Sequence, residues 1–237
     1  MDGLAKELAN KLFPESKSPK KDYRQLLSRL NNAINTLEVK MSDNEWDKIN
    51  FSKDVPSVAL MKYRKAFLNE VVKGRPPMGD EDETGNRLPQ DEVRVGCRKR
   101  LRDTMVDKKA SKLKGRQLFP HEIVQKFQHH NQMSTLEKDV LACQWNDIRT
   151  SVMEAMVAIA GKQEEEQQQE ESKEEEEEGM KVDLGKMVPL VDVSGSMYGT
   201  PIEVAISLGL LVSEITAPAY RNRCLTFSQT PTWVELQ

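Results

Sequence analysis

A long acidic segment without apolar side chains, residues 162–178, divides this chain into two parts. The segment contains ten glutamates and two lysines. It has no hydrophobic surface to bury, so it cannot belong to a packed core, and its composition is typical of a linker. We therefore predict that residues 162–179 connect two separately packed regions, residues 1–161 and 180–237.

The overall composition favours a protein that is neither secreted nor membrane-spanning. The chain has 237 residues, of which 31% are charged, and no stretch approaches the ~18 continuous apolar residues that a membrane span needs. Its start lacks the apolar core of a signal peptide. The cysteines form no CxxC pair, which argues against a disulfide framework and a cysteine zinc site. We expect a soluble intracellular protein, cytoplasmic or nuclear, without a membrane partner.

Residues 1–72 show the period of amphipathic helices and no alternating strand pattern. The apolar stripes predict three helices in this region, over residues 1–13, 23–37 and 58–72. Residues 16–21 are expected to form a loop. Ser42 and Glu45 have the spacing of a capping box, in which the two side chains satisfy backbone N–H groups at a helix start.

Residues 117–161 continue the helical region. One helix is expected to begin at Pro120, because proline is tolerated in the first turn, and a second is expected over 135–160. Three aromatic residues lie at helical core spacing and are expected to pack rather than to stack on bases: Trp46, Tyr63 and Trp145.

Residues 73–116 interrupt this helical pattern. Residues 73–90 are rich in proline, glycine and acids and predict an exposed loop. The basic block that follows has ten cations against two acids and is expected to be partly helical: Arg94, Arg98, Lys99, Arg100, Arg102, Lys108, Lys109, Lys112, Lys114 and Arg116. Such a block is either a solvated surface or a contact for the phosphates of RNA, which it can bind without reading bases.

Residues 180–237 predict an α/β unit. Its expected elements are a buried strand over 187–193, a helix over 201–215, and strands over 223–228 and 232–236. Thr200 and Glu203 flank Pro201 as a capping box that starts the helix. Strand, helix and strand in this order form a parallel unit with a right-handed crossover. The chain stops before a doubly wound domain is complete.

The most specific cluster of polar residues follows the first predicted strand. Asp192, Ser194 and Ser196 stand at the carboxyl end of that strand, where ligand sites of open α/β sheets lie. Carboxylate and hydroxyl oxygens are hard ligands suited to Mg²⁺ or a similar divalent cation. Because hydroxyls are neutral, a cation held mainly by serines stays electrophilic toward an incoming carboxylate. Gly195 lets the loop turn tightly between the two serines.

These residues show a resemblance. DVSGSM, followed by GTPIEVAISLGLLVSEI and RCLTFSQTP, resembles the start of a von Willebrand factor A-like (vWA-like) domain, whose metal-ion-dependent adhesion site begins with DxSxS. The chain is more closely similar to a large uncharacterised family that joins such a domain to a helical region, through EVKMSDNEWDKINFSKDVPSVALMKYRKAFL and LFPHEIV. This architecture is similar to the Ro (TROVE) ribonucleoproteins, where helical repeats bind RNA.

The resemblance implies a mostly helical, HEAT-like N-terminal region followed by a partial, Rossmann-like vWA module, an α plus α/β fold. It implies metal contacts from Ser194 and Ser196 and a direct or water-mediated contact from Asp192. The family pattern also needs a Thr and an Asp from two later loops. This chain ends at Gln237, before either loop, so the expected site is incomplete.

Enzymatic activity has little support in the sequence. The second Asp of haloacid-dehalogenase phosphatases, two residues after the first, is replaced here by Ser194. The three histidines, His121, His129 and His130, show no metal-ligand spacing, and the chain contains no phosphate-binding GxxxxGK[ST] loop and no GxSxG elbow. We therefore expect a non-enzymatic protein.

Three functions remain open at this point. The first is a binding or scaffold protein whose helical region and basic block engage RNA, while the vWA-like module engages a protein. The second is a metal-dependent adhesion module that binds an acidic residue of a protein partner and has no nucleic-acid role. The third is an inactive, shortened paralogue with an open sheet edge.

Overall fold

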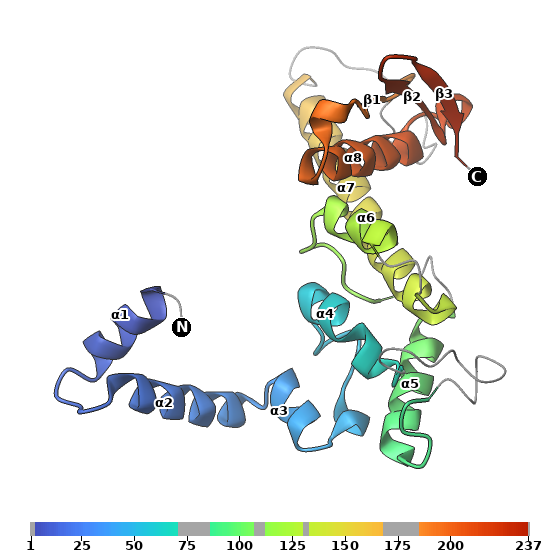
Figure 1. Ribbon diagram of the computed structural model, residues 1–237. Helices are drawn as coiled ribbons and strands as arrows, with labels where there is room; N and C mark the ends of the chain where they lie inside the picture. The colour runs from blue at the N-terminus through green and yellow to red at the C-terminus, as the bar shows by residue number, and fades with distance from the viewer. Residues whose placement is uncertain (1–2, 71–85, 107–111, 130–132, 168–184, 237) are drawn as a thin grey trace.

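The computed structural model describes residues 3–70, 86–106, 112–129, 133–167 and 185–236, with side chains up to residue 159 in the fourth range (Figure 1). The helices that precede the acidic segment are α1 (Gly3–Leu12), α2 (Pro19–Ile34), α3 (Leu37–Ser42), the 3₁₀ turn η1 (Trp46–Lys48), α4 (Ser57–Phe67), α5 (Glu92–Thr104), α6 (Pro120–His129) and α7 (Thr135–Gln167). We call α1 and α2 the N-terminal hairpin and the elements from α3 to α7 the helical body.

The α/β unit, residues 185–236, contains a three-stranded mixed sheet. Its elements are β1 (Leu190–Asp192), η2 (Gly195–Met197), α8 (Thr200–Ile215), η3 (Pro218–Tyr220), β2 (Arg223–Phe227) and β3 (Thr232–Glu235). β1 pairs with β2 in parallel, and β2 pairs with β3 in antiparallel fashion. A mostly helical chain with a small mixed sheet at its C-terminal end confirms the coarse fold class, α plus α/β.

The core of the helical body surrounds Phe67, which is fully buried. The rings of Trp46, Phe51 and Tyr63 meet it edge-on, with centroid distances of 6.1, 5.3 and 6.3 Å. A second cluster joins Met61 of α4 to residues of α6 and α7, and Trp145 packs against it. The expectation that Trp46, Tyr63 and Trp145 pack in the core is confirmed.

Several predicted boundaries were wrong, and two helix ends were wrong for the same reason. α2 begins at Pro19, inside the predicted loop, and ends because Asn35 adopts a left-handed conformation (φ 50°). α4 ends at Phe67 because Asn69 adopts the same conformation. Asparagine tolerates this region of φ/ψ space better than most residues, so it stops a helix where the apolar period alone would continue it.

Both predicted capping boxes were also wrong. Ser42 is the last residue of α3 and does not start a helix. At the other site the N-cap of α8 is Gly199 (φ 90°) and Thr200 is already helical, with no side-chain cap bond. The helix itself and its first-turn proline are confirmed. α7 continues to Gln167, six residues into the predicted linker, while residues 168–179 of that linker lie outside the described part.

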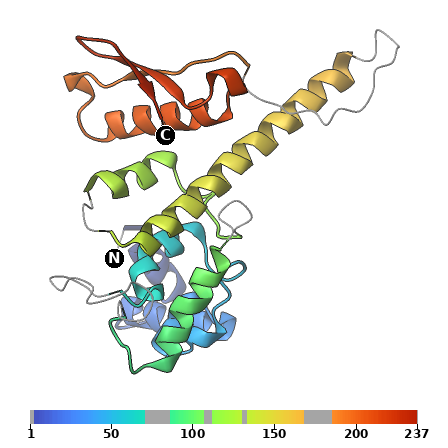
Figure 2. The same cartoon turned by 90° about the vertical axis from the view of Figure 1, so that its right-hand side faces the viewer.

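The α/β unit is joined to the helical body through α8, which lies between the sheet and α6 (Figure 2). Val191 of β1 packs against Gly209 of α8. At the C-terminal end of α8, the indole Nε1 of Trp145 donates hydrogen bonds of 3.1 and 3.0 Å to the two carboxylate oxygens of Glu214. The guanidinium of Arg149 lies 3.5 Å from the same carboxylate. A polar contact thus fixes α8 against α7.

Cys97, Cys143 and Cys224 are buried thiols that form no disulfide, and burial raises the pKa of Cys97 to about 11. Within the described residues, we find no helix that is both long and apolar enough to cross a membrane.

Candidate functional site

The structure brings Asp192, Ser194 and Ser196 together at the carboxyl end of β1. The backbone N–H of Val193 donates to the carbonyl of Phe227 (3.0 Å), so the β1–β2 pairing holds the start of the loop. The backbone N–H of Ser194 donates to Oδ1 of Asp192 (2.9 Å). The two serine Oγ atoms lie 3.0 Å apart. The three side chains therefore form one polar cluster, as the sequence predicted.

The cluster is accessible and carries a negative charge. Ser196 is exposed, while Asp192 and Ser194 are half-buried. Hydrogen bonds from the side chain and the backbone of Ser194 lower the pKa of Asp192 below its ordinary value. The carboxylate is therefore ionised at neutral pH, which is the state that binds a cation.

The local backbone explains how this loop leads into a helix. Gly199 has a φ of 90°, a conformation that favours glycine, and it redirects the chain after the 3₁₀ turn η2. Pro201, whose φ is fixed near the helical value, then occupies the first turn of α8. Because β1 and α8 are packed together through Val191 and Gly209, both ends of the loop are anchored.

The donor set fits a hard divalent cation. One ionised carboxylate and two neutral hydroxyls are oxygen ligands of the type that Mg²⁺ takes. No group of three His, Cys, Asp or Glu side chains in the described part of the chain could hold a metal ion. The Asp192 cluster differs from such groups because two of its three donors are hydroxyls.

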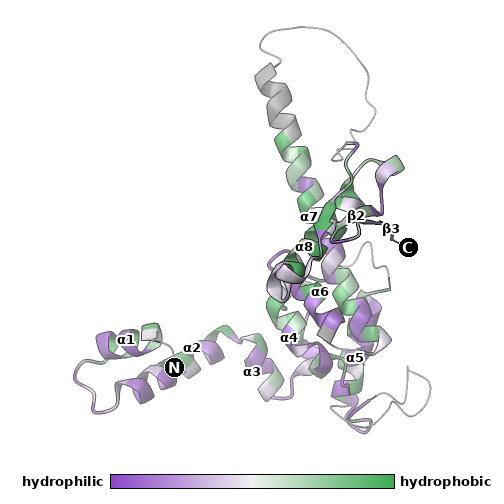
Figure 3. Ribbon diagram, turned by 45° about the horizontal axis from the view of Figure 1, so that its top comes forward, coloured by the Kyte–Doolittle hydropathy of each residue, from purple (hydrophilic) through white to green (hydrophobic). Residues whose placement is uncertain are grey.

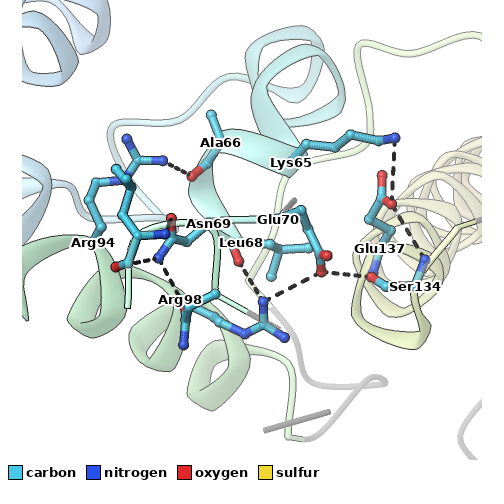
Figure 4. Close-up of polar contacts among 11 residues, drawn as sticks. Lys65, Ala66, Leu68, Asn69, Glu70, Arg94, Arg98, Ser134 and Glu137 are labelled. Carbon is cyan, nitrogen blue, oxygen red and sulfur yellow. Dashed lines mark hydrogen bonds and ion pairs between the residues drawn. The ribbon is translucent and has the colours of Figure 1, made fainter. Parts of the chain in front are cut away.

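Several cations of the basic block make contacts within the helical body, and Figure 4 shows two of them, Arg94 and Arg98. Arg94 of α5 donates to the carbonyl of Ala66 (2.6 Å), and its guanidinium stacks 3.7 Å from the centre of the Trp46 ring. Arg98 is buried and donates to the carbonyl of Leu68 (2.8 Å). Both arginines thus donate hydrogen bonds to backbone carbonyls at the end of α4, where the last carbonyls lack helical partners.

Three further cations of the basic block also bond within the chain. Arg100 donates to the carbonyl of Trp46 (2.6 Å) and Lys114 to that of Lys53 (2.6 Å). Arg116 pairs with two carboxylates of α7, those of Asp147 and Glu154 (3.1 and 2.9 Å). Lys99 and Lys112 are exposed, Arg102 is half-buried and has a polar partner, and Lys108 and Lys109 lie outside the described residues.

Sequence reasoning missed a buried polar network beside Arg98. Its guanidinium lies 3.6 Å from Glu70, which also accepts a hydrogen bond from the hydroxyl of Ser134 (2.8 Å). Glu137, almost fully buried, pairs with Arg64 (3.0 Å). Ser134 and Glu137 make the reciprocal contacts of a capping box at the start of α7, and that spacing was the available signal.

The histidines show no catalytic arrangement in the described part of the chain. His121 stacks on Phe119 with ring centroids 5.6 Å apart, which is a packing contact. His129 is the last residue of α6, and His130 lies outside the described residues.

Comparison with known proteins finds two domains of unknown function in the chain. Residues 14–73 match the family model DUF2828, and residues 186–237 match DUF7788. An uncharacterized protein of Acanthamoeba polyphaga mimivirus is 31% identical over 220 residues, which is 91% of this chain and 30% of that protein. The chain thus spans less than a third of the length of this curated relative. No solved structure matches the chain.

One matched segment coincides with a structural part, the α/β unit, and the other spans the boundary between the N-terminal hairpin and the helical body. DUF2828 covers the elements from α2 to α4, and DUF7788 covers the α/β unit with the Asp192 cluster. The segment between them holds the basic block and α7. The cluster and Glu214 both lie in the segment that matches DUF7788, whereas Trp145 and Arg149, which contact Glu214, lie between the two matched segments.

Proposed function

We propose that this chain is a non-enzymatic binding protein. Its α/β unit is a vWA-like module that captures an acidic group of a protein partner through a divalent cation. The helical body is the scaffold that holds this module. The observation that carries the proposal is the convergence of Asp192, Ser194 and Ser196 in one accessible, anchored loop.

The chemistry of the three side chains explains how such capture would work. The carboxylate of Asp192 and the hydroxyls of Ser194 and Ser196 are the groups that would hold Mg²⁺. When bound, the cation supplies a positive charge that the single carboxylate of the Asp192 cluster offsets in part, so it attracts a carboxylate of the partner. The hydrogen bonds that Asp192 receives from Ser194 keep its carboxylate ionised and oriented.

RNA binding through the basic block is the weaker proposal. Neutralising several phosphates needs several accessible cations. Arg94, Arg98 and Arg100 donate to backbone carbonyls of the helical body instead. The block's exposed cations among the described residues are Lys99, Lys112 and Arg116, and Arg116 already pairs with Asp147 and Glu154.

The test measures Mn²⁺ binding to the full chain at neutral pH by electron paramagnetic resonance. Mn²⁺ serves as a spectroscopic substitute for Mg²⁺. We expect saturable binding by the wild type that Mg²⁺ displaces. The double variant Ser194→Ala/Ser196→Ala and the single variant Asp192→Asn should each lose it. Ser28→Ala, at an exposed serine of α2, is the matched control and should bind like the wild type.

Two outcomes would reject the proposal. The first is a wild-type protein that binds no Mn²⁺ at millimolar concentration, which would favour an inactive paralogue. The second is saturable binding that survives in the double serine variant, because the cation would then sit elsewhere. Circular dichroism of each variant shows whether a loss of binding reflects a loss of fold.

A further inference from the structure

The N-terminal hairpin extends away from the helical body (Figure 1). α2 has sixteen residues and buries none of them, and α1 buries only Ala9. Helices of this length are marginal in water unless an amphipathic face is packed. The hairpin therefore carries much less buried surface than its length requires for independent stability.

Both helices of the hairpin carry an exposed apolar stripe. In α1 the stripe is Leu4, Leu8 and Leu12, and in α2 it includes Leu27, Leu30 and Ile34. Their exposed fractions range from 38% to 72%. Spacings of three and four residues place the members of each stripe on one side of their helix. Figure 3 shows hydrophobic and hydrophilic segments alternating along the two helices.

The stripe of α2 is bordered by positive charge. Lys20 and Arg24, seven and three residues before Leu27, are exposed on the same side of α2 as the stripe, and no described acidic side chain forms an ion pair with either of them. Asp22, the acidic residue of α2, accepts a hydrogen bond from Ser16. An apolar stripe flanked by two cations that make no ion pair with a described acid is complementary to an apolar stripe flanked by acids.

The surface beside the stripe is also hollowed. A depression of about 420 Å³ lies between α2 and α3. Arg24 and Leu27 line its α2 side, and Val39 lines its α3 side together with two acids, Glu38 and Asp43. Arg24 and Leu27 belong both to this depression and to the charged apolar face. A concave surface fits the protruding side chains of a folded partner better than it fits a lipid surface, which is smooth on this scale.

We propose that the N-terminal hairpin is the docking site for an acidic amphipathic helix of a protein partner. The leucine stripes would pack against the apolar face of that helix, and Lys20 and Arg24 would pair with its acidic residues. This interaction is separate from the Asp192 cluster and needs no divalent cation.

The test uses the full chain and a fluorescent synthetic peptide, and it measures fluorescence anisotropy in the presence of EDTA. The peptide places leucines at the core positions of a heptad repeat and glutamates at the flanking ones. A scrambled peptide of the same composition has no apolar face and is the first control. We expect saturable binding of the amphipathic peptide and none of the scrambled one.

Two variants probe the two parts of the surface. Leu30→Ser/Ile34→Ser removes apolar contacts, and Lys20→Glu/Arg24→Glu reverses charge. Each should weaken binding by about tenfold or more. The matched controls, Val106→Ser/Phe119→Ser and Lys99→Glu/Lys112→Glu, change exposed residues elsewhere and should bind like the wild type.

The charge-reversed variant also provides a gain of function. It should bind a lysine version of the peptide more tightly than the wild type does, which a misfolded hairpin could not do. Equal binding of the scrambled peptide, or equal weakening by the control variants, would overturn the proposal. The proposal would also be overturned if phosphatidylserine vesicles or duplex RNA bound through these residues while the acidic peptide did not bind. Because EDTA is present, failure here leaves the Mn²⁺ test unaffected.

Discussion

The helical body buries its large side chains more completely than the α/β unit does. In the helical body, Phe67 is enclosed by three aromatic rings, and arginines of α5 satisfy the carbonyls at the end of α4. In the α/β unit, α8 covers the face of the sheet on which Val191 lies. The opposite face carries large exposed side chains, those of Leu190, Phe227 and Trp233.

The two regions therefore differ in stability and in accessibility. The helical body has buried apolar and polar contacts that span long distances in the sequence, so we expect most of the free energy of unfolding to come from it. The register pairs Asp192 with Phe227, which puts the candidate cluster at the edge of the uncovered face. Binding surfaces must be accessible, and the less enclosed unit provides that access.

The largest expected effect is the loss of a buried aromatic side chain from the helical body, compared with the loss of an exposed one from the α/β unit. Phe67→Ala removes a fully buried ring and should lower the free energy of unfolding by about 3–5 kcal/mol. Phe227→Ala removes a ring that is 53% exposed, so it should cost less than about 1 kcal/mol. Urea unfolding followed by far-ultraviolet circular dichroism measures both. Similar losses for the two variants would show that the α/β unit is as tightly packed as the helical body.

A second pair of variants compares close backbone contacts. A Cβ atom on Gly115 would lie 2.0 Å from the backbone oxygen of Gln144, whereas one on Gly209 would meet Cγ2 of Val191 at 2.3 Å. A backbone cannot yield as a side chain can, so Gly115→Ala should cost about 2–3 kcal/mol and Gly209→Ala about 1 kcal/mol.

The cost at Gly209 should also be reversible, because it has a single cause. In Gly209→Ala/Val191→Ala the clashing methyl group is gone, and the midpoint of urea unfolding should rise above that of Gly209→Ala alone. A double variant less stable than both single variants would mean that Val191 stabilises the unit through contacts other than the one with α8.

The sequence was sufficient where partners are close along the chain. Asp192, Ser194 and Ser196 lie within five residues, and the strand before them and the proline after them are local signals. The crossover from β1 through α8 to β2 was predictable for the same reason. The sequence therefore identified the candidate cluster and the elements that hold it.

The sequence was insufficient where partners are distant. Arg98 reads as one cation of a basic block, but its guanidinium binds the carbonyl of Leu68, thirty residues earlier. The hydroxyl of Ser134 reaches Glu70 across 64 residues. Composition cannot show which charges the fold uses internally, because that depends on how α4, α5 and α7 pack together.

A smaller effect is expected at the joint between the two regions. Glu214→Ala removes the acceptor of the Trp145 indole and the partner of Arg149. We expect a loss of about 1 kcal/mol, since the contact is partly solvent-exposed. The emission of Trp145 should also change, and the α/β unit should unfold at lower urea than the helical body. Glu235→Ala, which removes an exposed contact with Arg223, should change neither. A single, unshifted transition in Glu214→Ala would show that apolar packing of α6 against α8 suffices.

The smallest expected effect is a pH dependence of opposite sign in the two regions. Burial raises the pKa of Glu70 in the helical body, while hydrogen bonds from Ser194 lower that of Asp192 in the α/β unit. The stabilising contribution of Glu70 is therefore present below its unfolded pKa, near 4.5, and is lost as the pH rises through the folded value. That of Asp192 is present above its unfolded pKa, near 3.8, and is lost as the pH falls.

Glu70→Gln and Asp192→Asn separate these two contributions when each is unfolded by urea at several pH values in EDTA. Between acidic and neutral pH, the stability of Glu70→Gln relative to the wild type should rise, because the variant no longer holds a buried carboxylate. The stability of Asp192→Asn relative to the wild type should fall over the same range, because the amide cannot accept the Ser194 hydrogen bonds as strongly as the ionised carboxylate does. If the relative stabilities of both variants changed in the same direction with pH, Arg98 would compensate the charge of Glu70 in full. The polar network around Glu70 would then tolerate ionisation as well as the open loop of the α/β unit does.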